Sequence, residues 1–474
     1  MCGIAGFLSK TIELDKKKLK KVKTLMSIRG PDGFGKYQFD LKNKKKVCLL
    51  HSRLMIIDPT EKSNQPMKDE NGILIFNGMI YNYLEIKKDL ISKNIKFNTN
   101  SDTEVLLKFL NYYGPNKLEK LDGMWAFAYF NFKNKNLILS RDKFGEKPLY
   151  FSFRNKKFIF GSNPNYILSL DDQGYKPNYS KLTSFIENSF RGLYFDNQSL
   201  FENISQLNPG SFLKLSQNNK IEIKKYWSPE KNNLKTNKKY SNVVNILKKK
   251  FKKSIEKRLI SDFPISCALS GGIDSGSIVS IAKKKFNKKI NCFSIEPKNK
   301  NYNENKNILS VVRQNNLNHN FVKIKKDNNK NLNILEDIIK KTSNFVPTTT
   351  WLIFDSLCKK IKRSNHKVIL SGAGGDEMYG GYYMHHLHFL YSIRNENYFN
   401  IKLNEWKKYV LPLIRNNNLK DFKNFKNLKS DSDRKFLEYL HNRTYIKKRS
   451  SKMKMPNLKN KLDYFKKNLF LDFF

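Results

Sequence analysis

Cys2, which directly follows the initiator methionine, is the residue of this chain best placed for covalent chemistry. Once Met1 is removed, a thiol and a free α-amine belong to one residue. Because an α-amine has a pKa of about 7.7–8.0, it can take the thiol proton near neutral pH and later return it. Cys2 alone is also compatible with an ordinary residue near a frayed terminus. Gly3 and Gly6 let the backbone and a substrate approach each other closely. With these glycines, a thiol and an α-amine on one residue predict a nucleophile that carries its own base.

Three later segments supply groups that suit an amino-acid substrate. Arg53, at the end of an apolar strand, offers a fork for an α-carboxylate. Asn77 and Gly78 form a strand-to-turn element that can aim a side-chain amide and a backbone N–H at an oxyanion. Asp102 opens a helix and can meet an ammonium. Each of these, taken singly, is equally typical of a plain turn or a helix cap.

With the segments 121–128 and 140–150, these motifs resemble the glutaminase domain of the class II, N-terminal-nucleophile amidotransferases, from Cys2 to about Gly161. The resemblance implies that Cys2 attacks the amide carbon of glutamine and releases ammonia through a thioester. It also implies two sets of residues around that thiol: Asn77 and Gly78 at the oxyanion, and Arg53, Asn77 and Asp102 on glutamine.

Two positions depart from the family pattern. Met79 stands where the family has a glutamate that helps to hold the α-amine, and a thioether cannot neutralise an ammonium. Ser162-Asn163 replaces a Ser-Glu pair. Weaker glutamine binding or a degenerate site are the expected consequences of Met79.

A second chemical site begins where the apolar strand 263–269 runs into the glycine-rich sequence from Ser270 to Ser277 and then a helix. A strand, a glycine turn and a helix start form a phosphate cradle, because backbone N–H groups and the helix dipole favour an anion. The lysine of a Walker A loop is missing. The pattern Ser-Gly-Gly-x-Asp-Ser resembles the pyrophosphate loop of ATP pyrophosphatases. The resemblance implies ATP binding by Leu269, Ser270, Gly271, Gly272, Asp274, Ser275, Ile295, Ser371 and Gly372.

A second short strand, 367–370, also ends in glycines and acidic residues. Adjacent carboxylates at the carboxyl end of a strand suit Mg²⁺, which prefers oxygen ligands shared with substrate phosphates. We therefore predict Asp274 and Asp376 as Mg²⁺ ligands, and Asp376 and Glu377 at the acceptor site. The segment resembles the second synthetase motif of the asparagine synthetase family, with Ala373 where that family often has glutamate, which leaves the acceptor open.

The length of 474 residues and the order of the motifs predict two domains. We expect a glutaminase domain at 1–215, a polar linker at 216–242 and an ATP-dependent synthetase domain at 243–474. The family resemblance implies a four-layer αββα sandwich followed by an α/β domain with a parallel sheet and additional helices. Two lysine- and arginine-containing segments usual in the family are missing before Phe474, so we expect a truncated or short variant.

The amino-acid composition limits which other classes of protein this chain could belong to. Five cysteines without a C-x-x-C pair argue against a disulfide framework or a zinc site. Without a long apolar window or a signal core, we expect a cytoplasmic protein with no membrane partner. A net charge of +48 raises nucleic-acid binding as a rival function. The excess is mostly lysine spread along the chain, so we expect no specific nucleic-acid partner.

These observations favour a glutamine-hydrolysing asparagine synthase, an ATP-dependent carbon–nitrogen ligase whose partners are glutamine, ATP and aspartate, with ATP and Mg²⁺ as cofactors. Ammonia from the first site would amidate an aspartyl-AMP formed at the second. Two alternatives stay open: a related amidotransferase acting on another carboxylate, such as a sugar or small metabolite, and a degenerate non-catalytic family member. A homodimer is among the assemblies to test, because the sequence leaves the oligomeric state open.

Overall fold

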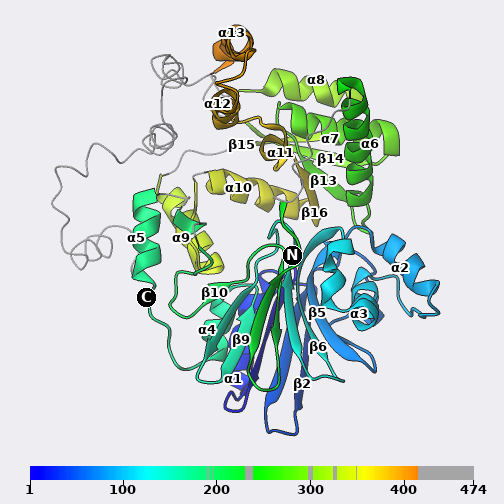
Figure 1. Ribbon diagram of the computed structural model, residues 1–474, viewed down its shortest axis with the longest axis vertical. Coiled ribbons are helices and arrows are strands. Elements are labelled where there is room, and N and C mark those ends of the chain that lie inside the picture. The colour runs from blue at the N-terminus through cyan, green and yellow to red at the C-terminus, as the bar shows by residue number, and fades with distance from the viewer. Residues whose placement is uncertain are drawn as a thin grey trace, which may run out of the picture. The chain divides into compact units, whose positions relative to one another are not determined.

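A computed structural model describes residues 1–188, 192–194, 196–229, 239–296, 303–323, 328–348 and 350–414 of the chain. It contains two compact units, and the division between them falls between Leu370 and Ser371. The first unit holds two antiparallel sheets and a parallel sheet, and the second is helical (Figure 1).

Two six-stranded antiparallel sheets form the N-terminal part. The first has the order β10-β8-β9-β1-β3-β2 and the second the order β12-β11-β7-β6-β5-β4. The strands of the first sheet are β1 (Gly3–Ser9), β2 (Gly33–Asp40), β3 (Lys46–Arg53), β8 (Tyr150–Arg154), β9 (Lys157–Gly161) and β10 (Ser205–Gln206). Those of the second are β4 (Met67–Lys68), β5 (Gly72–Ile80), β6 (Gly123–Asn131), β7 (Leu137–Arg141), β11 (Ser211–Leu215) and β12 (Ile221–Lys225).

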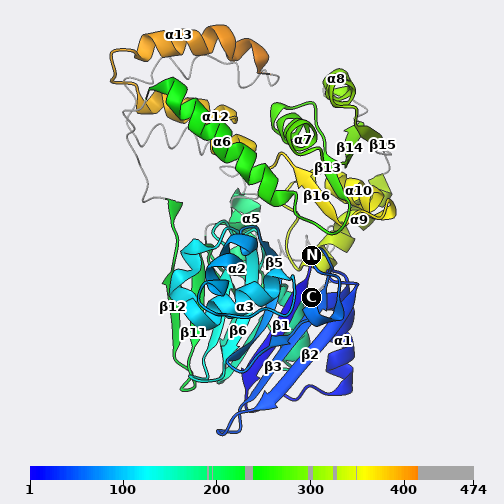
Figure 2. The same cartoon turned by 90° about the vertical axis from the view of Figure 1, so that its right-hand side faces the viewer.

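The two-residue side-chain period of the strands builds three apolar layers. Ile4 of β1 and Ile75 of β5 are buried in the core between the sheets. Phe7 of β1 points to the opposite face, under α1 (Lys16–Ser27) and α4 (Pro164–Leu170). Phe76 of β5 packs under α2 (Tyr83–Ile91) and α3 (Asp102–Tyr113). These layers confirm the predicted αββα sandwich, in which each sheet is covered by its own helix pair (Figure 2).

The second sheet extends into the segment that we expected to be a linker. In β12, Ile221 pairs with Leu215 and Lys225 with Ser211 of β11. Residues 221–225, inside the stretch 216–242 that we expected to be a polar linker, are therefore a strand, and the domain boundaries stay a prediction. Alternate residues of this strand are charged, and an edge strand tolerates such residues because only one of its edges pairs.

The parallel sheet has the order β15-β14-β13-β16, and both β13–β14 and β14–β15 pair in parallel. Its strands are β13 (Ile265–Ala268), β14 (Ile290–Glu296), β15 (Asn318–Lys323) and β16 (Val368–Ser371). The helices around it are α6 (Tyr240–Arg258), α7 (Ile273–Phe286), α8 (Asn305–Asn315), α9 (Asn328–Thr342) and α10 (Thr350–Arg363). Val279 of α7 and Leu357 of α10 lie in separate apolar clusters, so helices cover both faces, as a parallel sheet requires.

The second unit contains α11 (Gly375–Tyr379), α12 (Tyr383–Ser392) and α13 (Phe399–Tyr409). Leu387, Leu390, Phe399 and Trp406 form its buried core. These are additional helices of the kind that the sequence predicted. Within the described ranges, no helix is both long enough and apolar enough to span a bilayer. Two shorter segments also have defined structure: α5 (Tyr179–Asn188) and the 3₁₀ turn Pro115–Lys120.

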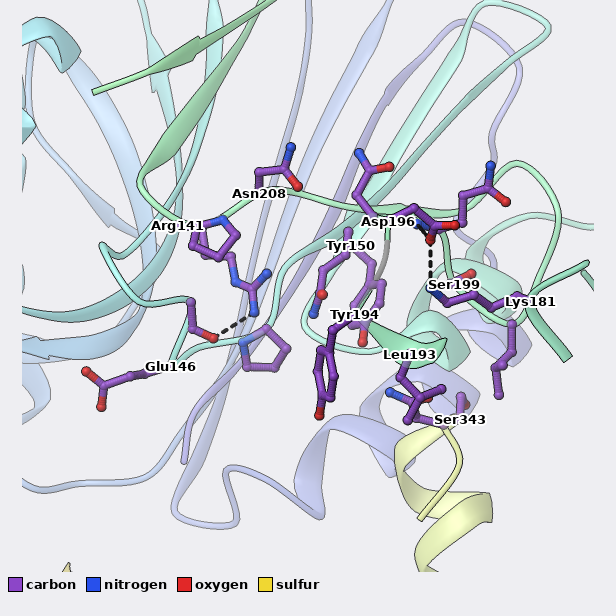
Figure 3. Close-up of a pocket in the computed structure, with 18 of the residues that line it drawn as sticks. Arg141, Glu146, Tyr150, Lys181, Leu193, Tyr194, Asp196, Ser199, Asn208 and Ser343 are labelled. Atoms are coloured by element: carbon purple, nitrogen blue, oxygen red, sulfur yellow. Dashed lines mark hydrogen bonds and ion pairs between the residues drawn. The ribbon is translucent and has the colours of Figure 1, made fainter. Parts of the chain in front are cut away.

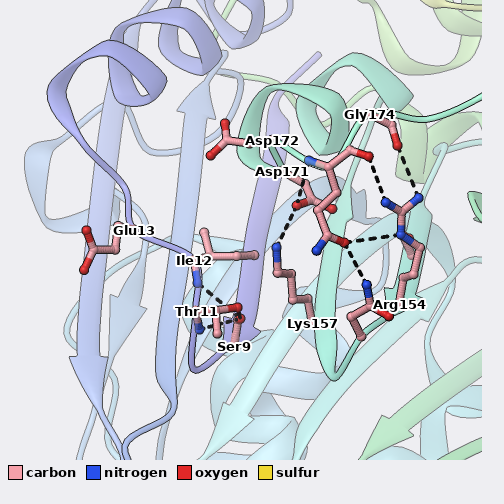
Figure 4. Close-up of polar contacts among 12 residues, drawn as sticks. Ser9, Thr11, Ile12, Glu13, Arg154, Lys157, Asp171, Asp172 and Gly174 are labelled. Atoms are coloured by element: carbon pink, nitrogen blue, oxygen red, sulfur yellow. Dashed lines mark hydrogen bonds and ion pairs between the residues drawn. The ribbon is translucent and has the colours of Figure 1, made fainter.

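A buried carboxylate ties the segment after α4 to the β8–β9 hairpin (Figure 4). Asp171 accepts hydrogen bonds from Lys157 Nζ at 3.1 Å and from the Tyr175 hydroxyl at 3.1 Å, and its side chain is 1% exposed. The neighbouring Asp172 pairs with Lys18, but its side chain is 76% exposed. Buried charged hydrogen bonds contribute far more to stability than exposed ion pairs.

We therefore expect Asp171→Ala to lower the local stability of the hairpin by about 1–3 kcal/mol, because two buried donors lose their acceptor. Hydrogen–deuterium exchange of the amides of residues 150–161 would measure this as faster exchange. Asp172→Ala is the matched control and should change exchange little. Equal effects of the two substitutions would contradict the assigned role of Asp171.

Candidate functional site

The pairing of β1 with β3 brings the Cys2 thiol to the end of the sandwich. Gly3 pairs with Ser52, and the Leu54 N–H just beyond β3 donates to Cys2 Sγ at 3.3 Å. Ser162 supports the same strand, because its hydroxyl accepts from the Ile4 N–H at 3.1 Å. Burial raises the pKa of the Cys2 thiol, and the N-terminal amine and Lys147 oppose that rise.

The N-terminal amine lies in a buried, cation-rich environment. The amine of Met1 donates to the carbonyl of Arg29 at 3.1 Å, and Arg29 Nε donates to the Cys2 carbonyl at 3.1 Å. Burial lowers the pKa of this amine to about 5, and the charges of Arg29 and Lys147 lower it further, whereas Asp32 and Cys2 raise it. The amine that Met1 carries is therefore uncharged near neutral pH.

Arg53, predicted as the carboxylate fork, is held rigidly at the end of β3. Its guanidinium donates to the carbonyl of Thr60 at 2.9 Å, to Asn64 Oδ1 at 2.8 Å and to the carbonyl of Asp58. Arginine has five N–H donors, so donors remain for a ligand after these three bonds. Cys2, Asp32 and Asp102 are among the groups whose charges act on Arg53.

Asn77 and Gly78 occupy the β5 strand, with Asn77 on the same side as the inward-facing Ile75. Asn77 Nδ2 is buried and has no hydrogen-bond partner among the residues that the structure describes. Such a buried donor costs free energy unless a ligand satisfies it. A Cβ on Gly78 would lie 2.2 Å from the carbonyl oxygen of Met124, so the strand pairing itself requires glycine here.

Asp102 is the first residue of α3, whose cap is the hydroxyl of Ser101. Its Oδ2 accepts from the Ile80 N–H at the end of β5, at 3.0 Å. Burial raises the pKa of Asp102 to about 6, although hydrogen bonds and Arg53 favour its charged form. Met79 is buried in β5 on the side that Asn77 also faces. Asp102 is thus a buried carboxylate at the end of β5, the strand that also carries the buried Met79.

Electrostatic coupling shows which of the predicted residues lie together. Asp102 and Lys147 act on the Cys2 thiol, and Cys2 and Asp102 act on Arg53. Sequence analysis missed the contributions of Arg29 and Lys147. Lys147 lies in the segment 140–150 that contributed to the resemblance, but nothing in its residue type or spacing indicated that the fold would direct it to the N-terminus.

The predicted phosphate loop connects β13 to α7. Ser275 is buried, and its hydroxyl accepts from the Ser270 N–H at 3.0 Å and lies 2.9 Å from Ser270 Oγ. The loop therefore closes on itself across the first turn of α7, where Asp274 also lies. Leu269, predicted to contact ATP, is buried and donates its N–H to the carbonyl of Phe293 in β14.

Two further residues support this loop from neighbouring elements. Glu304 Oε2 accepts from the Gly271 N–H at 3.1 Å, and a Cβ on Gly271 would lie 2.5 Å from Glu304 Cβ. His319 Nε2 lies 2.8 Å from Ser294 Oγ, which donates to the carbonyl of Leu269. Neither contact was predicted, because both depend on the lateral pairing of parallel strands. Ile295, predicted to contact ATP, is half-buried in β14.

The acidic segment of the second unit has its own local order. Ser371 ends β16, and the Gly372 carbonyl accepts from the Gly375 N–H at 3.1 Å. Asp376 and Glu377 begin α11, and Tyr382 donates to Glu377 Oε1 at 2.8 Å, which lowers the pKa of Glu377. Over the described part of the chain, no group of three or more His, Cys, Asp or Glu side chains is arranged to hold a metal. The Mg²⁺ assignment stays a prediction.

A pocket of about 790 Å³ lies beside the loop between β7 and β8 (Figure 3). Glu146 and Pro148 of that loop line it, together with Tyr194 and the ion pair of Lys181 with Asp196, which is 2.6 Å long. Lys147, between Glu146 and Pro148, instead directs its Nζ to Met1 Sδ at 3.5 Å. The same loop therefore contributes to this pocket and to the surroundings of the N-terminus.

The phosphate loop yields a prediction that depends only on its hydrogen bonds. Ser275→Ala removes the hydroxyl that accepts from the Ser270 N–H, at a cost of about 1 kcal/mol per bond. Amide exchange at residues 270–272 should then become roughly 5–10-fold faster. Ser277→Ala, two residues further along α7, is the control. Unchanged exchange in Ser275→Ala would contradict the proposed closure.

Comparison with known proteins follows the same division of the chain. Residues 1–227 match a family model described as a glutamine amidotransferase domain, and residues 247–473 match one described as asparagine synthase. A protein of Methanocaldococcus jannaschii, provisionally named glutamine-hydrolyzing asparagine synthetase 2, is 32% identical over 81% of this chain and 76% of its own length. Glutamine-hydrolyzing asparagine synthetase 1 of Bacillus subtilis is 30% identical over 81% of this chain and 59% of its own length.

Among solved structures, the glutamine phosphoribosylpyrophosphate amidotransferase of B. subtilis, complexed with ADP and GMP, matches with a TM-score of 0.35 and 12% identity. That match covers 69% of this chain and 70% of the other. The chain thus spans about three quarters of the M. jannaschii relative and less than two thirds of the B. subtilis synthetase.

Proposed function

Because the chain belongs to the glutamine-hydrolysing asparagine synthetase family, we propose that it is an ATP-dependent carbon–nitrogen ligase that converts aspartate to asparagine with glutamine as the nitrogen donor. We assign glutamine hydrolysis to residues 1–215 and amidation to residues 243–474. The observation that carries the first assignment is the buried Asn77 Nδ2, which lacks a partner in the described residues. An oxyanion would satisfy it.

In the first reaction, the Cys2 thiol gives its proton to the α-amine and the thiolate bonds to the amide carbon of glutamine. The carbon–nitrogen bond breaks, and ammonia leaves with the proton returned by the α-ammonium. Water then hydrolyses the thioester to glutamate. Removal of Met1 is part of this proposal, because only then does Cys2 carry the free amine. Arg53 would bind the carboxylate of glutamine, and Asp102 its ammonium.

In the second reaction, the aspartate side-chain carboxylate bonds to the α-phosphorus of ATP and pyrophosphate leaves. Ammonia then bonds to the acyl carbon and AMP leaves. The glycine-rich loop and the N-terminal end of α7 would hold the phosphates. The N–H groups of Ser270 and Gly271, which bond to Ser275 and Glu304 here, would have to exchange those partners for phosphate oxygens. Mg²⁺ would neutralise phosphate charge. We propose Asp274 and Asp376 as its ligands, because Mg²⁺ takes one or two carboxylates together with phosphate oxygens and water.

Another carboxylate acceptor is the second candidate. It is favoured by Ala373, which is exposed and cannot supply the carboxylate of the family's frequent glutamate. Pyrophosphate release from Mg·ATP with glutamine, measured with and without aspartate and then with a panel of other carboxylic acids, separates the two. Release that requires aspartate and yields asparagine would support the first candidate. Release only with another acid would overturn it.

Cys2→Ala tests the separation of the two reactions. The variant should lose glutamine-dependent amidation, because it has no thiol, and should retain ammonia-dependent amidation. Pyrophosphate and amide product are measured with glutamine and with ammonium chloride as the nitrogen source. Loss of both activities in a folded variant would contradict the two-site proposal.

The pKa of Asp102 predicts how glutamine binding depends on pH. Below about pH 6 this carboxyl is protonated and loses the charge that would pair with an ammonium. The Kd for glutamine in the Cys2→Ala background should therefore rise roughly tenfold from pH 7 to pH 5. Calorimetric titration measures this, and Asp102→Asn should bind weakly with little pH dependence. An inflection near pH 4 in the Asp102 protein would contradict the assignment.

A further inference from the structure

Lys147 is a buried cation to which the proposed chemistry gives no role. The residue is 7% exposed. Both backbone polar groups of Lys147 are hydrogen-bonded. Its N–H donates to Asp142 Oδ2 at 2.9 Å, and its carbonyl accepts from Arg141 Nε at 2.8 Å. The loop therefore holds the side chain in one direction, toward Met1.

The ammonium has little to compensate its burial. Its nearest contact is the thioether sulfur of Met1 at 3.5 Å, and sulfur is a weak acceptor. It makes no ion pair with any carboxylate of the described ranges. Asp142, the nearby carboxylate, already accepts backbone N–H bonds from Trp125, Phe144, Glu146 and Lys147. Burying a cation with so weak a partner is costly.

The charged surroundings of Lys147 point toward the nucleophile. The groups that act on its charge are Arg29, Glu146, Asp142 and Cys2. The charged side chains of other elements that act on the Cys2 thiol or on the N-terminal amine are Arg29, Asp32, Asp102 and Lys147. Arg53, at the end of β3, also interacts electrostatically with Cys2. When Met1 is removed, the sulfur contact disappears, but the backbone bonds that hold Lys147 in its loop do not involve Met1.

We propose that Lys147 is a positioning residue of the glutaminase site, whose ammonium stabilises the Cys2 thiolate and keeps the neighbouring α-amine uncharged, so that the amine can accept the thiol proton. This rests on the proposed glutaminase function. The cation favours the anionic thiolate and disfavours a second cation close by. The first effect favours loss of the thiol proton, and the second keeps the amine unprotonated at neutral pH, so that it is free to receive that proton. In the buried site both effects are only weakly screened by salt.

Lys147 acts on an amine at this end of the chain: it is one of the causes, after burial and Arg29, that lower the pKa of the Met1 amine to about 5. Arg29 cannot replace Lys147 directly. Its Nε is already bound to the Cys2 carbonyl, which fixes the backbone of the nucleophile and leaves the region of the Met1 sulfur to Lys147.

The test measures the thiol itself. The rate of alkylation of Cys2 by iodoacetamide, an uncharged reagent, is followed from pH 5 to pH 10 by mass spectrometry of the N-terminal peptide, in protein verified to lack Met1. We expect Lys147→Met to raise the pH midpoint of alkylation by about one unit or more. We also expect kcat for glutamine hydrolysis to fall roughly tenfold, with the KM for glutamine and ammonia-dependent amidation nearly unchanged.

Lys143→Met is the matched control. Lys143 lies in the same loop, but its ammonium donates to the carbonyls of Glu119 and Leu121, and its loss should leave the midpoint unchanged. Lys147→Arg keeps the charge and should keep the midpoint near that of the parent protein, which guards against a mere folding defect in Lys147→Met. An unchanged midpoint in Lys147→Met, or the same shift in both Lys147 variants, would overturn the proposal. Because alkylation needs no glutamine, a shifted midpoint without glutamine hydrolysis would instead overturn the proposed function.

Discussion

The antiparallel pairing of β1 with its neighbours is the constraint on which the candidate glutaminase site depends. The register that sets Gly3 opposite Ser52 fixes where the chain's first residues emerge, and it delivers Cys2 to the N–H of Leu54. A slip of one residue would turn every side chain of β1 to the other face. Ile4 would then leave the core between the sheets, so the burial of the strand and the placement of the nucleophile are enforced by the same interaction.

The polar groups of this site are few and are held by backbone more than by one another. Arg53 is bound by the carbonyls of Thr60 and Asp58 and by Asn64, and Asp102 by the N–H of Ile80. Such bonds orient a charged group without neutralising it, so that it can act on a ligand. Burial then shifts the pKa values of the ionisable groups. It raises the pKa of Asp102 to about 6 and lowers that of the Met1 amine to about 5, so both groups change charge on the acid side of neutral pH.

The phosphate loop is organised differently, because its order is largely local. Ser270 and Ser275 are five residues apart and hydrogen-bond across the first turn of α7. Its two longer contacts, to Glu304 and through Ser294 to His319, come from the strands and helices that follow in the parallel sheet. The loop's shape therefore needs only its own sequence, while its position needs the sheet. Sequence motifs of this compact kind are correspondingly easy to recognise.

The sequence by itself determined the elements that short spacings encode: the cysteine behind the initiator methionine, the glycine-rich loop between a strand and a helix, the caps, and the alternation that makes each strand two-faced. From these, and from a family resemblance, the αββα sandwich, the parallel sheet and the main candidate residues could be predicted. Residues 221–225 were placed in the linker because of their polar surroundings, and only their pairing with β11 shows that they form a strand.

Only the tertiary structure decided which of these residues act on one another. Asn77 became an unsatisfied buried donor because two sheets close over it, and Lys147 became a cation beside the nucleophile because a loop between β7 and β8 turns it toward residue 1. Residues 1 and 147 are far apart along the chain, and no local spacing links them. Their proximity, and the desolvation that shifts the pKa of each group, arise from the closure of long-range contacts, which sequence periodicity cannot encode.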